Sequence, residues 1–338
     1  MKMTKLVIAA AVATAVSTAA SAATLDDVKA KGFVQCGVTT GLAGFAAPND
    51  QGEWEGFDVD VCRALAAAIF GAPTQVKFTP TTGVDRFPAL QSGEVDLLAR
   101  NTTWTFSRDV NLGFEFTGVN YYDGQGFMIK KDMGISSAKE LDGASVCIQT
   151  GTTTELNLAD FFRANGMNFT SVVVQTGDEA RQAYEAGRCD VYTTDASGLA
   201  AQRSTMADPS EHVILPEIIS KEPLGPLVRH GDNNWGDIVR WTLNALIIAE
   251  ELGVTSENVD DMKANSTNPE VLRLLGAEGD MGQQLGLSND WAYNAIKSVG
   301  NYGESFERNL GVNTPLALER GLNALWTDGG ILYAPPMR

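Results

Sequence analysis

This sequence has few histidines and no CxxC motif. The 338 residues include two histidines, His212 and His230, and four cysteines, none of which forms a CxxC pair or lies near a histidine. Zinc sites draw their ligands from clusters of these residue types. We therefore expect no metal site, and we expect no cofactor of another kind.

Basic residues are also few. Lys and Arg number 25 against 42 Asp and Glu, which gives a net charge of -17 and a pI of about 4.5, and no basic run occurs. Such a chain repels phosphate backbones and anionic lipids. This excludes nucleic-acid binding and peripheral membrane binding as main roles. The 44% of hydrophobic and 20% of charged side chains are otherwise typical of a globular protein with one or two cores.

Apolar runs long enough to span a membrane are absent. Residues 1–22 place Lys2 and Lys5 before an apolar stretch from Leu6 to Val16, and small residues follow up to Ala22. The stretch is shorter than the roughly 20 residues of a spanning helix, and its small-residue end is typical of a cleavage site. We therefore predict a signal peptide over 1–22, cleaved near Ala22, rather than a membrane anchor.

The remaining chain alternates strand and helix patterns in two successive sets. The first set has strands over 32–38, 75–78 and 95–99 with helices over 61–70 and 84–92. The second has strands over 144–149, 171–175 and 190–194 with helices over 155–165 and 179–186. Two α/β sets of this kind predict two lobes.

Two strand-like segments, 127–130 and 225–229, are candidates for the crossings between the lobes. If they lie side by side, the first lobe is discontinuous. We expect lobe 1 to comprise 24–122 plus 227–338, and lobe 2 to comprise 123–226.

The four cysteines of an exported chain meet an oxidising compartment and allow three pairings. Pairing Cys36 with Cys62 and Cys147 with Cys189 keeps each bridge inside one lobe and leaves the lobes free to move. The alternative is that the cysteines are inert buried thiols.

A dense polar stretch, Asp96 to Asp109, follows the strand over 95–99. Polar side chains at the carboxyl end of a strand are typical of a ligand-binding edge. Arg108 can hold a carboxylate through the paired donors of its guanidinium. The alternative is a surface ion pair with Asp109.

Two more stretches carry candidate ligand-binding residues. Thr152 and Glu155 have the spacing of a capping box, so hydroxyl and backbone donors gather at a helix N-terminus that favours an anion. The alternative is a plain helix cap. Asp195 ends the strand over 190–194, where its carboxylate can accept an ammonium group or serve as the N-cap of the next helix.

Together, these stretches resemble in order and spacing the polar amino-acid-binding proteins of ABC transporters, solute-binding protein family 3. The matching pieces are Gly56–Asp60, Asn101–Arg108, Gly151–Thr153 and Asp190–Asp195, and the likeness covers roughly 33–244. Gly300–Gly311 is also similar to the final helices of the general L-amino-acid-binding proteins of proteobacteria. The resemblance implies a two-lobed α/β fold of the type II periplasmic binding class, each lobe a mainly parallel sheet flanked by helices.

The resemblance also implies roles for individual residues. Arg108 would clamp the α-carboxylate of an L-amino acid with help from Thr103 and the Thr153 region, and Asp195 would accept the α-ammonium. Asn101 and the backbone near it would add contacts. The other candidate ligand-binding residues are Arg100, which would meet a polar or acidic side chain or point to solvent, and Thr152 at the helix N-terminus.

Two departures from relatives that bind basic amino acids bear on specificity. Those relatives carry an acidic residue where this chain has Thr39 and an aromatic residue near Gly83. Strict lysine or arginine specificity is therefore not expected, and we favour a broad range that leans to polar or acidic amino acids.

The mechanism that the resemblance implies is a two-lobed periplasmic protein that closes on its ligand and delivers it to the permease subunits of an ABC transporter. The lobes would close through crossings near 118–126 and 222–226. We expect a monomer and no catalytic residue. One rival is a periplasmic dehydratase-like enzyme on the same fold, for which Asp195 and Glu155 are the nameable acid–base groups. The other is a ligand-loaded partner of a chemoreceptor.

Overall fold

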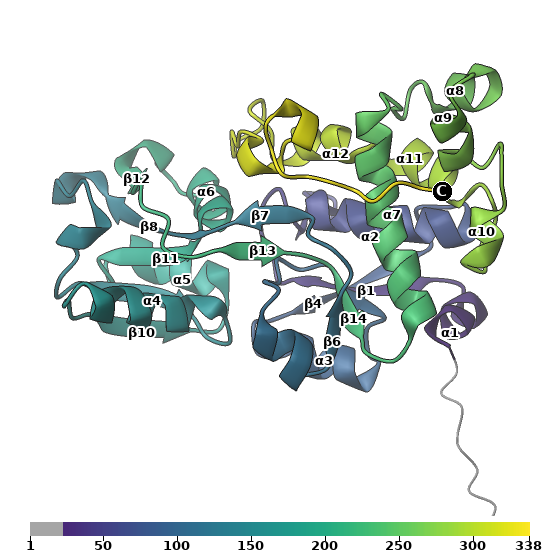
Figure 1. The fold of residues 1–338 in the computed structure, drawn as a ribbon. Helices are drawn as coiled ribbons and strands as arrows, with labels where there is room; N and C mark the ends of the chain where they lie inside the picture. The colour runs from purple at the N-terminus through teal and green to yellow at the C-terminus, as the bar shows by residue number, and fades with distance from the viewer. Residues whose placement is uncertain (1–22) are drawn as a thin grey trace, which may run out of the picture.

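The computed structural model describes residues 23–338, so the predicted signal peptide lies outside the described residues. Two α/β lobes lie next to each other and are joined by a narrow pair of strands (Figure 1). Lobe 1 contains one five-stranded sheet and lobe 2 contains the other.

The sheet of lobe 1 has the strand order β4-β1-β5-β14-β6. Its strands are β1 (Val34–Thr39), β4 (Val76–Thr81), β5 (Leu97–Leu98), β6 (Phe114–Phe116) and β14 (Leu227–Arg229). β4, β1 and β5 are parallel, whereas β14 pairs antiparallel with β5 and β6. β1 is buried along almost its whole length, as expected of a central strand covered on both faces.

The helices of lobe 1 include a long C-terminal set. They are α1 (Thr24–Lys31), α2 (Phe57–Phe70), α3 (Arg86–Ser92), α7 (Asn233–Glu251), α8 (Val259–Asn265), α9 (Pro269–Leu274), α10 (Met281–Gln284), α11 (Trp291–Val299) and α12 (Tyr302–Asn309). α2 is apolar on most of its surface, and 11 of its 14 residues are buried against β1, α7 and α11. It ends where Gly71 adopts a left-handed conformation, which glycine takes without a Cβ penalty.

The sheet of lobe 2 has the strand order β10-β9-β11-β8-β12. Its strands are β8 (Gln125–Lys130), β9 (Ser145–Gln149), β10 (Thr170–Val174), β11 (Val191–Asp195) and β12 (His212–Ile214), and its helices are α4 (Thr153–Ala164), α5 (Gly177–Glu185) and α6 (Ala196–Ser204). β10, β9 and β11 are parallel, and β8 runs antiparallel to β11 and β12. In each sheet four of the five strands therefore run in one direction, and the fifth, β14 or β8, runs antiparallel to them, so the prediction of mainly parallel sheets is confirmed.

Two short strands, β7 (Tyr121–Asp123) and β13 (Glu222–Leu224), pair antiparallel and form the crossings between the lobes. These strands lie within the predicted crossings, 118–126 and 222–226, whereas 127–130 and 225–229 do not lie side by side. The first segment belongs to β8 in lobe 2 and the second to β14 in lobe 1. β8 follows the crossing strand β7, and β14 follows the crossing strand β13. Both β8 and β14 therefore run antiparallel to the other strands of their sheets. A further small ribbon is formed by β2 (Ala47–Pro48) and β3 (Trp54–Glu55).

The predicted disulfide pairing is confirmed. Cys36 in β1 bonds to Cys62 in α2, and Cys147 in β9 bonds to Cys189, two residues before β11. Each bridge ties a strand to a helix or loop of the same lobe, so neither crosses from one lobe to the other.

In residues 23–338, no helix combines the length and the apolar character needed to cross a membrane. The same residues hold no cluster of three or more His, Cys, Asp or Glu side chains with metal-binding geometry.

Candidate functional site

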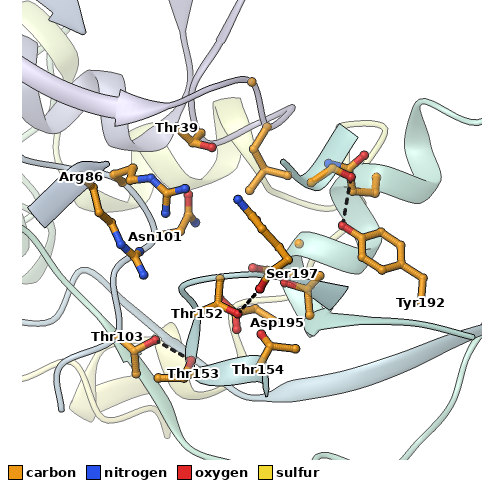
Figure 2. Close-up of a pocket in the computed structure, with 18 of the residues that line it drawn as sticks. Thr39, Arg86, Asn101, Thr103, Thr152, Thr153, Thr154, Tyr192, Asp195 and Ser197 are labelled. Carbon is orange, nitrogen blue, oxygen red and sulfur yellow. Dashed lines mark hydrogen bonds between the residues drawn. The ribbon is translucent and has the colours of Figure 1, made fainter. Parts of the chain in front are cut away.

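A cavity lies between the two lobes at the carboxyl ends of β1, β5, β9 and β11 (Figure 2). It offers about 60 Å³ to the centre of a water-sized molecule. A single water needs about 10–15 Å³ by the same measure, so the cavity admits a small solute. All seven predicted ligand-binding residues line it, namely Arg100, Asn101, Thr103, Arg108, Thr152, Thr153 and Asp195.

Arg108 reaches the cavity from a short helical turn of lobe 1 and is buried. Its Nη1 donates to the Thr103 carbonyl at 2.8 Å, which fixes the guanidinium and leaves its other donors for a ligand. Burial lowers the pKa of Arg108, and the nearby carboxylates of Glu222 and Asp195 oppose that shift. Arg108 forms no ion pair with Asp109, whose carboxylate instead lies near His230. The surface-pair alternative is therefore wrong.

Asp195 stands at the opposite wall, at the end of β11 in lobe 2. It precedes α6 but makes no capping hydrogen bond with its side chain, so the carboxylate is not occupied by the helix. Burial raises the pKa of Asp195 well above its usual range, and the negative charges of Asp123 and Glu222 raise it further. A cationic group in the cavity would relieve this cost.

Thr103 and Thr153 approach each other from different lobes. Their hydroxyl oxygens lie 3.5 Å apart, and both hydroxyls donate to Oε2 of Glu222, at 2.5 Å and 2.9 Å respectively. These hydroxyl hydrogens are thus already directed at a carboxylate of the protein. Contacts of these two residues with a bound carboxylate would therefore come from their backbone N–H groups.

The predicted capping box of Thr152 and Glu155 does not form. Thr152 is the N-cap residue of α4, but its hydroxyl donates to the Gln149 carbonyl at 2.7 Å, and Glu155 accepts from the Gly151 N–H at 2.9 Å. The first backbone N–H groups of a helix lack partners within the helix. Because the Thr152 side chain does not cap them, the N-terminus of α4 faces the cavity as an anion-binding edge.

Asn101 is held in an uncommon backbone conformation, with a φ of 43°. Its N–H donates to Asp58 Oδ2 at 3.1 Å, and Asn120 donates to the other oxygen of the same carboxylate at 3.0 Å. The Asn101 Oδ1 atom is buried without a partner among the described residues. Burial raises the pKa of Asp58 to about 6, although these hydrogen bonds oppose the shift.

Arg100 points into the cavity rather than to solvent. It is buried, and its Nε donates to the Thr81 carbonyl at 3.1 Å. Burial and the neighbouring Arg108 lower the pKa of Arg100 to about 10, so it remains charged at neutral pH. Of the two sequence-based alternatives, the one in which Arg100 faces a ligand side chain is the one compatible with this placement.

Sequence reasoning missed a third arginine in the cavity wall. Arg86 begins α3 and is 2% exposed. Its Nη1 donates to Thr102 of lobe 1 at 3.2 Å, its Nη2 donates to the Gly151 carbonyl of lobe 2 at 3.1 Å, and its Nε is buried without a partner in the described chain. A signal was present, because Arg86 shares the buried face of α3 with Ala89 and Leu90. An arginine is rarely buried unless its guanidinium has polar partners.

The chain matches the bacterial extracellular solute-binding proteins, family 3, over residues 34–262. It belongs to this family. The expected two-lobed fold of solute-binding family 3 is confirmed by this match and by a solved structure that is similar over nearly the whole chain. Among solved structures, an ABC transporter periplasmic binding protein from Brucella ovis with glutathione bound has a TM-score of 0.92 and 62% identity, with 94% of this chain and 100% of that chain covered.

Two family members are similar over their whole length. The general L-amino acid-binding periplasmic protein AapJ of Rhizobium johnstonii is 62% identical, covering 100% of this chain and 99% of the relative. The glutamate/glutamine/aspartate/asparagine-binding protein BztA of Rhodobacter capsulatus is 61% identical, covering 97% of each chain. These relatives are named as binding proteins and not as enzymes.

Proposed function

We propose that this protein is an extracytoplasmic solute-binding protein that captures free L-amino acids between its lobes and delivers them to an ABC permease. The observation that carries the proposal is that Arg108 of lobe 1 and Asp195 of lobe 2 line one small cavity. A zwitterion presents opposite charges at a fixed separation. Because one lobe binds the carboxylate and the other binds the ammonium, closure of the lobes depends on a ligand that carries both groups.

The proposal assigns the α-carboxylate to Arg108, to the N-terminus of α4 at Thr152 and Thr153, and to the backbone of Thr103. Asp195 takes the α-ammonium, and Asn101 adds polar contacts near it. The lobes that close are 24–122 plus 227–338 and 123–226, moving about β7 and β13. The chain acts as an exported monomer in the periplasm, after removal of residues 1–22.

The charges of the cavity favour acidic ligands. Three arginines line it, Arg86, Arg100 and Arg108, against one carboxylate, Asp195. An amino acid with a second carboxylate would offset more of this positive charge than a neutral one would. The Rhodobacter capsulatus relative is named for binding glutamate, glutamine, aspartate and asparagine, which supports the same range. Arg100 and Arg86 are the partners we assign to the ligand side chain.

Glutathione is a second candidate ligand, because a relative from Brucella ovis is described with glutathione bound. Its γ-glutamyl end carries a free α-ammonium and α-carboxylate, which the same two charged residues would hold.

The dehydratase-like alternative needs an acid–base group in the cavity besides the clamp. Glu155 does not line the cavity and is engaged by Gly151, so Asp195 alone remains from the two residues named for that role. The proposed function involves no bond breaking, and every ligand should be recovered unchanged.

The test is calorimetry of the ligand-stripped protein against the twenty amino acids, followed by chromatography of the recovered ligand. We expect saturable binding of glutamate, glutamine, aspartate and asparagine, and intact ligand afterwards. Absence of binding to every amino acid would refute the proposal, and conversion of the ligand would favour the enzyme. Loss of uptake in a deletion strain separates transport from a role as a chemoreceptor partner.

A further inference from the structure

The crossing strand β7 is held at its lobe 1 end by helix α12. The hydroxyl of Tyr302 donates to the carbonyl of Asn120, the residue before β7, at 2.8 Å. The ring of Phe306, one turn later in α12, stacks on Tyr121 of β7 with the ring centres 6.2 Å apart. All four residues are buried. The first residues of this crossing are therefore fixed to a helix that comes much later in the chain.

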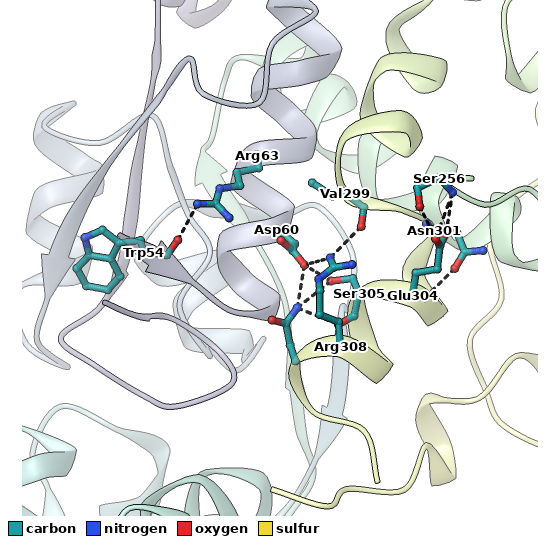
Figure 3. A network of polar contacts seen from close by, with 10 residues as sticks. Trp54, Asp60, Arg63, Ser256, Val299, Asn301, Glu304, Ser305 and Arg308 are labelled. Atoms are coloured by element: carbon teal, nitrogen blue, oxygen red, sulfur yellow. Dashed lines mark hydrogen bonds and ion pairs between the residues drawn. The ribbon is translucent and has the colours of Figure 1, made fainter. Parts of the chain in front are cut away.

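Helix α12 is itself fixed to α2 of lobe 1 by one buried carboxylate (Figure 3). Asp60 Oδ2 accepts hydrogen bonds from three residues of α12, which are Ser305 at 2.6 Å, Arg308 at 2.5 Å and Asn309 at 2.8 Å. Helix α2 packs against the central strand β1 and is joined to it by the Cys36–Cys62 bridge. The end of β7 that α12 holds therefore moves with lobe 1 during closure.

Tyr122, in the middle of β7, is held by one side chain of the C-terminal segment. Asn323 accepts from the Tyr122 N–H at 2.6 Å and donates to the Tyr122 carbonyl at 3.1 Å. On the other edge, the residue of β13 in register with Tyr122 is Pro223, which has no N–H to donate. A ribbon of two strands is marginally stable by itself. At this residue the Asn323 amide takes the place of a third strand.

The position of Asn323 is fixed by Arg320, which precedes the turn Gly321–Asn323. Arg320 donates to both carboxylate oxygens of Glu250 in α7, at 2.9 Å and 3.1 Å, and its Nε donates to the Asn323 carbonyl at 2.9 Å. Such a bidentate pair has a defined geometry. The guanidinium also lies over the rings of Tyr302 and Phe306, 5.2 Å and 5.0 Å from their centres. The side chains that hold β7 therefore form one connected network.

The anchoring of both crossings limits where β7 can bend. The N–H of Trp104 in lobe 1 donates to the carbonyl of Pro223 in β13 at 2.8 Å, so β13 is tied to lobe 1 as well. On the other side of β7, the N–H of Ala196 in lobe 2 donates to the carbonyl of Gly124 at 2.8 Å. The change of direction during closure therefore falls on residues 122–124, directly after the part of β7 that the C-terminal network holds.

We propose that Tyr302, Phe306, Arg320 and Asn323 form a hinge support, which keeps β7 ordered in the ligand-free protein and so raises the affinity for the ligand. The inference rests on the proposed function, because it concerns closure of the lobes on an amino acid. All four residues lie beyond the segment 34–262 that matches the family, and none lines the ligand cavity. They are positioning residues. Without them, closure would have to order the backbone of β7, and this loss of entropy would weaken binding.

Two substitutions loosen the hinge support without changing the cavity. Asn323→Ala removes both hydrogen bonds to Tyr122. Arg320→Lys keeps a positive charge beside Glu250 but removes the guanidinium donor to the Asn323 carbonyl, so it perturbs the same segment at a partly buried residue. Asn289→Ala is the matched control, because the Asn289 amide also bonds two backbone groups of the C-terminal region, but in and around the loop between α10 and α11.

Hydrogen exchange of the ligand-free protein, followed by mass spectrometry, measures the order of β7, and calorimetry with L-glutamate measures affinity. In Asn323→Ala we expect the amides of 120–124 to exchange about fivefold faster or more, while the sheets of both lobes exchange as before. The affinity should fall about fivefold or more, which corresponds to the ~1 kcal/mol of ordering one backbone residue. Arg320→Lys should change both quantities in the same direction, and Asn289→Ala should change neither.

Three results would overturn the inference: unchanged exchange of 120–124 in Asn323→Ala, faster exchange with unchanged affinity, or equal effects of Asn323→Ala and Asn289→Ala. An unmodified protein that binds no amino acid would instead refute the proposed function. Hydrogen exchange needs no ligand, so it would still decide whether Asn323 orders β7.

Discussion

Thr103 of lobe 1 donates a hydrogen bond of 2.5 Å to Glu222, a residue of the crossing strand β13 that is 1% exposed. Glu222 also accepts from Thr153, Asn157 and Ser220, so four donors converge on one buried carboxylate. Because Thr103 and Thr153 belong to different lobes, this carboxylate joins the two walls of the cavity. Opening the lobes must separate Glu222 from at least one of these threonines.

Replacing Glu222 by glutamine should weaken ligand binding about tenfold or more. The amide group cannot accept on its nitrogen, so one pair of donors loses its acceptor, and hydrogen bonds to charged groups contribute about 1.5–3 kcal/mol each. Calorimetry with L-glutamate measures the change. Asn157→Ala is the control, because it removes one donor from lobe 2 and keeps the bridge from Thr103 to Thr153. Equal effects of the two substitutions would contradict a role in joining the lobes.

Arg108→Ala and Asp195→Ala should each abolish measurable binding of amino acids. Removing one partner of a desolvated charge pair costs about 3–5 kcal/mol, which corresponds to more than about a hundredfold in affinity. Arg163→Ala and Asp160→Ala are matched charge removals in an exposed pair of α4. These controls should bind normally. All four variants should unfold cooperatively, as followed by circular dichroism, and retained affinity in either site variant would count against the clamp.

Gly83→Ala should hinder closure without touching a charged residue. Gly83 of lobe 1 lies against lobe 2, and a Cβ built on it would lie 2.6 Å from the carbonyl oxygen of Thr150. Contacts this short require one lobe to shift, so we expect affinity to fall about tenfold while stability stays close to that of the unmodified protein. Gly126→Ala is the control, because its Cβ would lie 3.5 Å or more from the nearest atoms, which is ordinary van der Waals contact.

Small-angle X-ray scattering with saturating L-glutamate gives a second measurement of Gly83→Ala. The unmodified protein should become more compact on binding, and the variant should remain more extended. A variant that closes to the same radius of gyration would show that the approach of Gly83 to Thr150 is not needed for closure.

Affinity should fall as the solution is acidified. Burial and the charges of Asp123 and Glu222 raise the pKa of Asp195, whereas a bound ammonium favours the ionised form and lowers it. Binding therefore releases a proton, and affinity decreases as the pH falls through the raised value. Calorimetry in buffers of different ionisation enthalpy measures the released proton.

The Asp123→Asn variant checks the origin of this pH dependence. Removing the charge of Asp123 takes away one cause of the raised pKa of Asp195, so the loss of affinity should move to lower pH. An unchanged pH profile in Asp123→Asn would contradict the assignment of the titrating group.

Local sequence patterns predicted the residues that sit where strands end. Arg108 lies in the short helical turn after β5 of lobe 1, Asp195 is the last residue of β11 of lobe 2, and the carboxyl ends of neighbouring parallel strands share one edge of a sheet. The disulfide pairing was predictable for a related reason, since each bridge joins two segments of the same α/β set.

The residues that sequence reasoning missed depend on contacts between distant segments. Glu222 lies 119 residues from Thr103 and 69 from Thr153, and no local pattern places the three together. The capping box failed because Thr152 and Glu155 found other partners in the same turn, Gln149 and Gly151. The spacing of the two residues shows that a capping box is possible, but it does not show which hydrogen-bond partners their side chains will bind.

The most direct test of the central claim is a crystal structure of the protein with L-glutamate bound. We predict that the ligand nitrogen lies within hydrogen-bond distance of the Asp195 carboxylate and that the α-carboxylate lies on the Arg108 guanidinium. A complex in which either group faces away from the ligand, or in which the two ends of the ligand are reversed, would contradict the account.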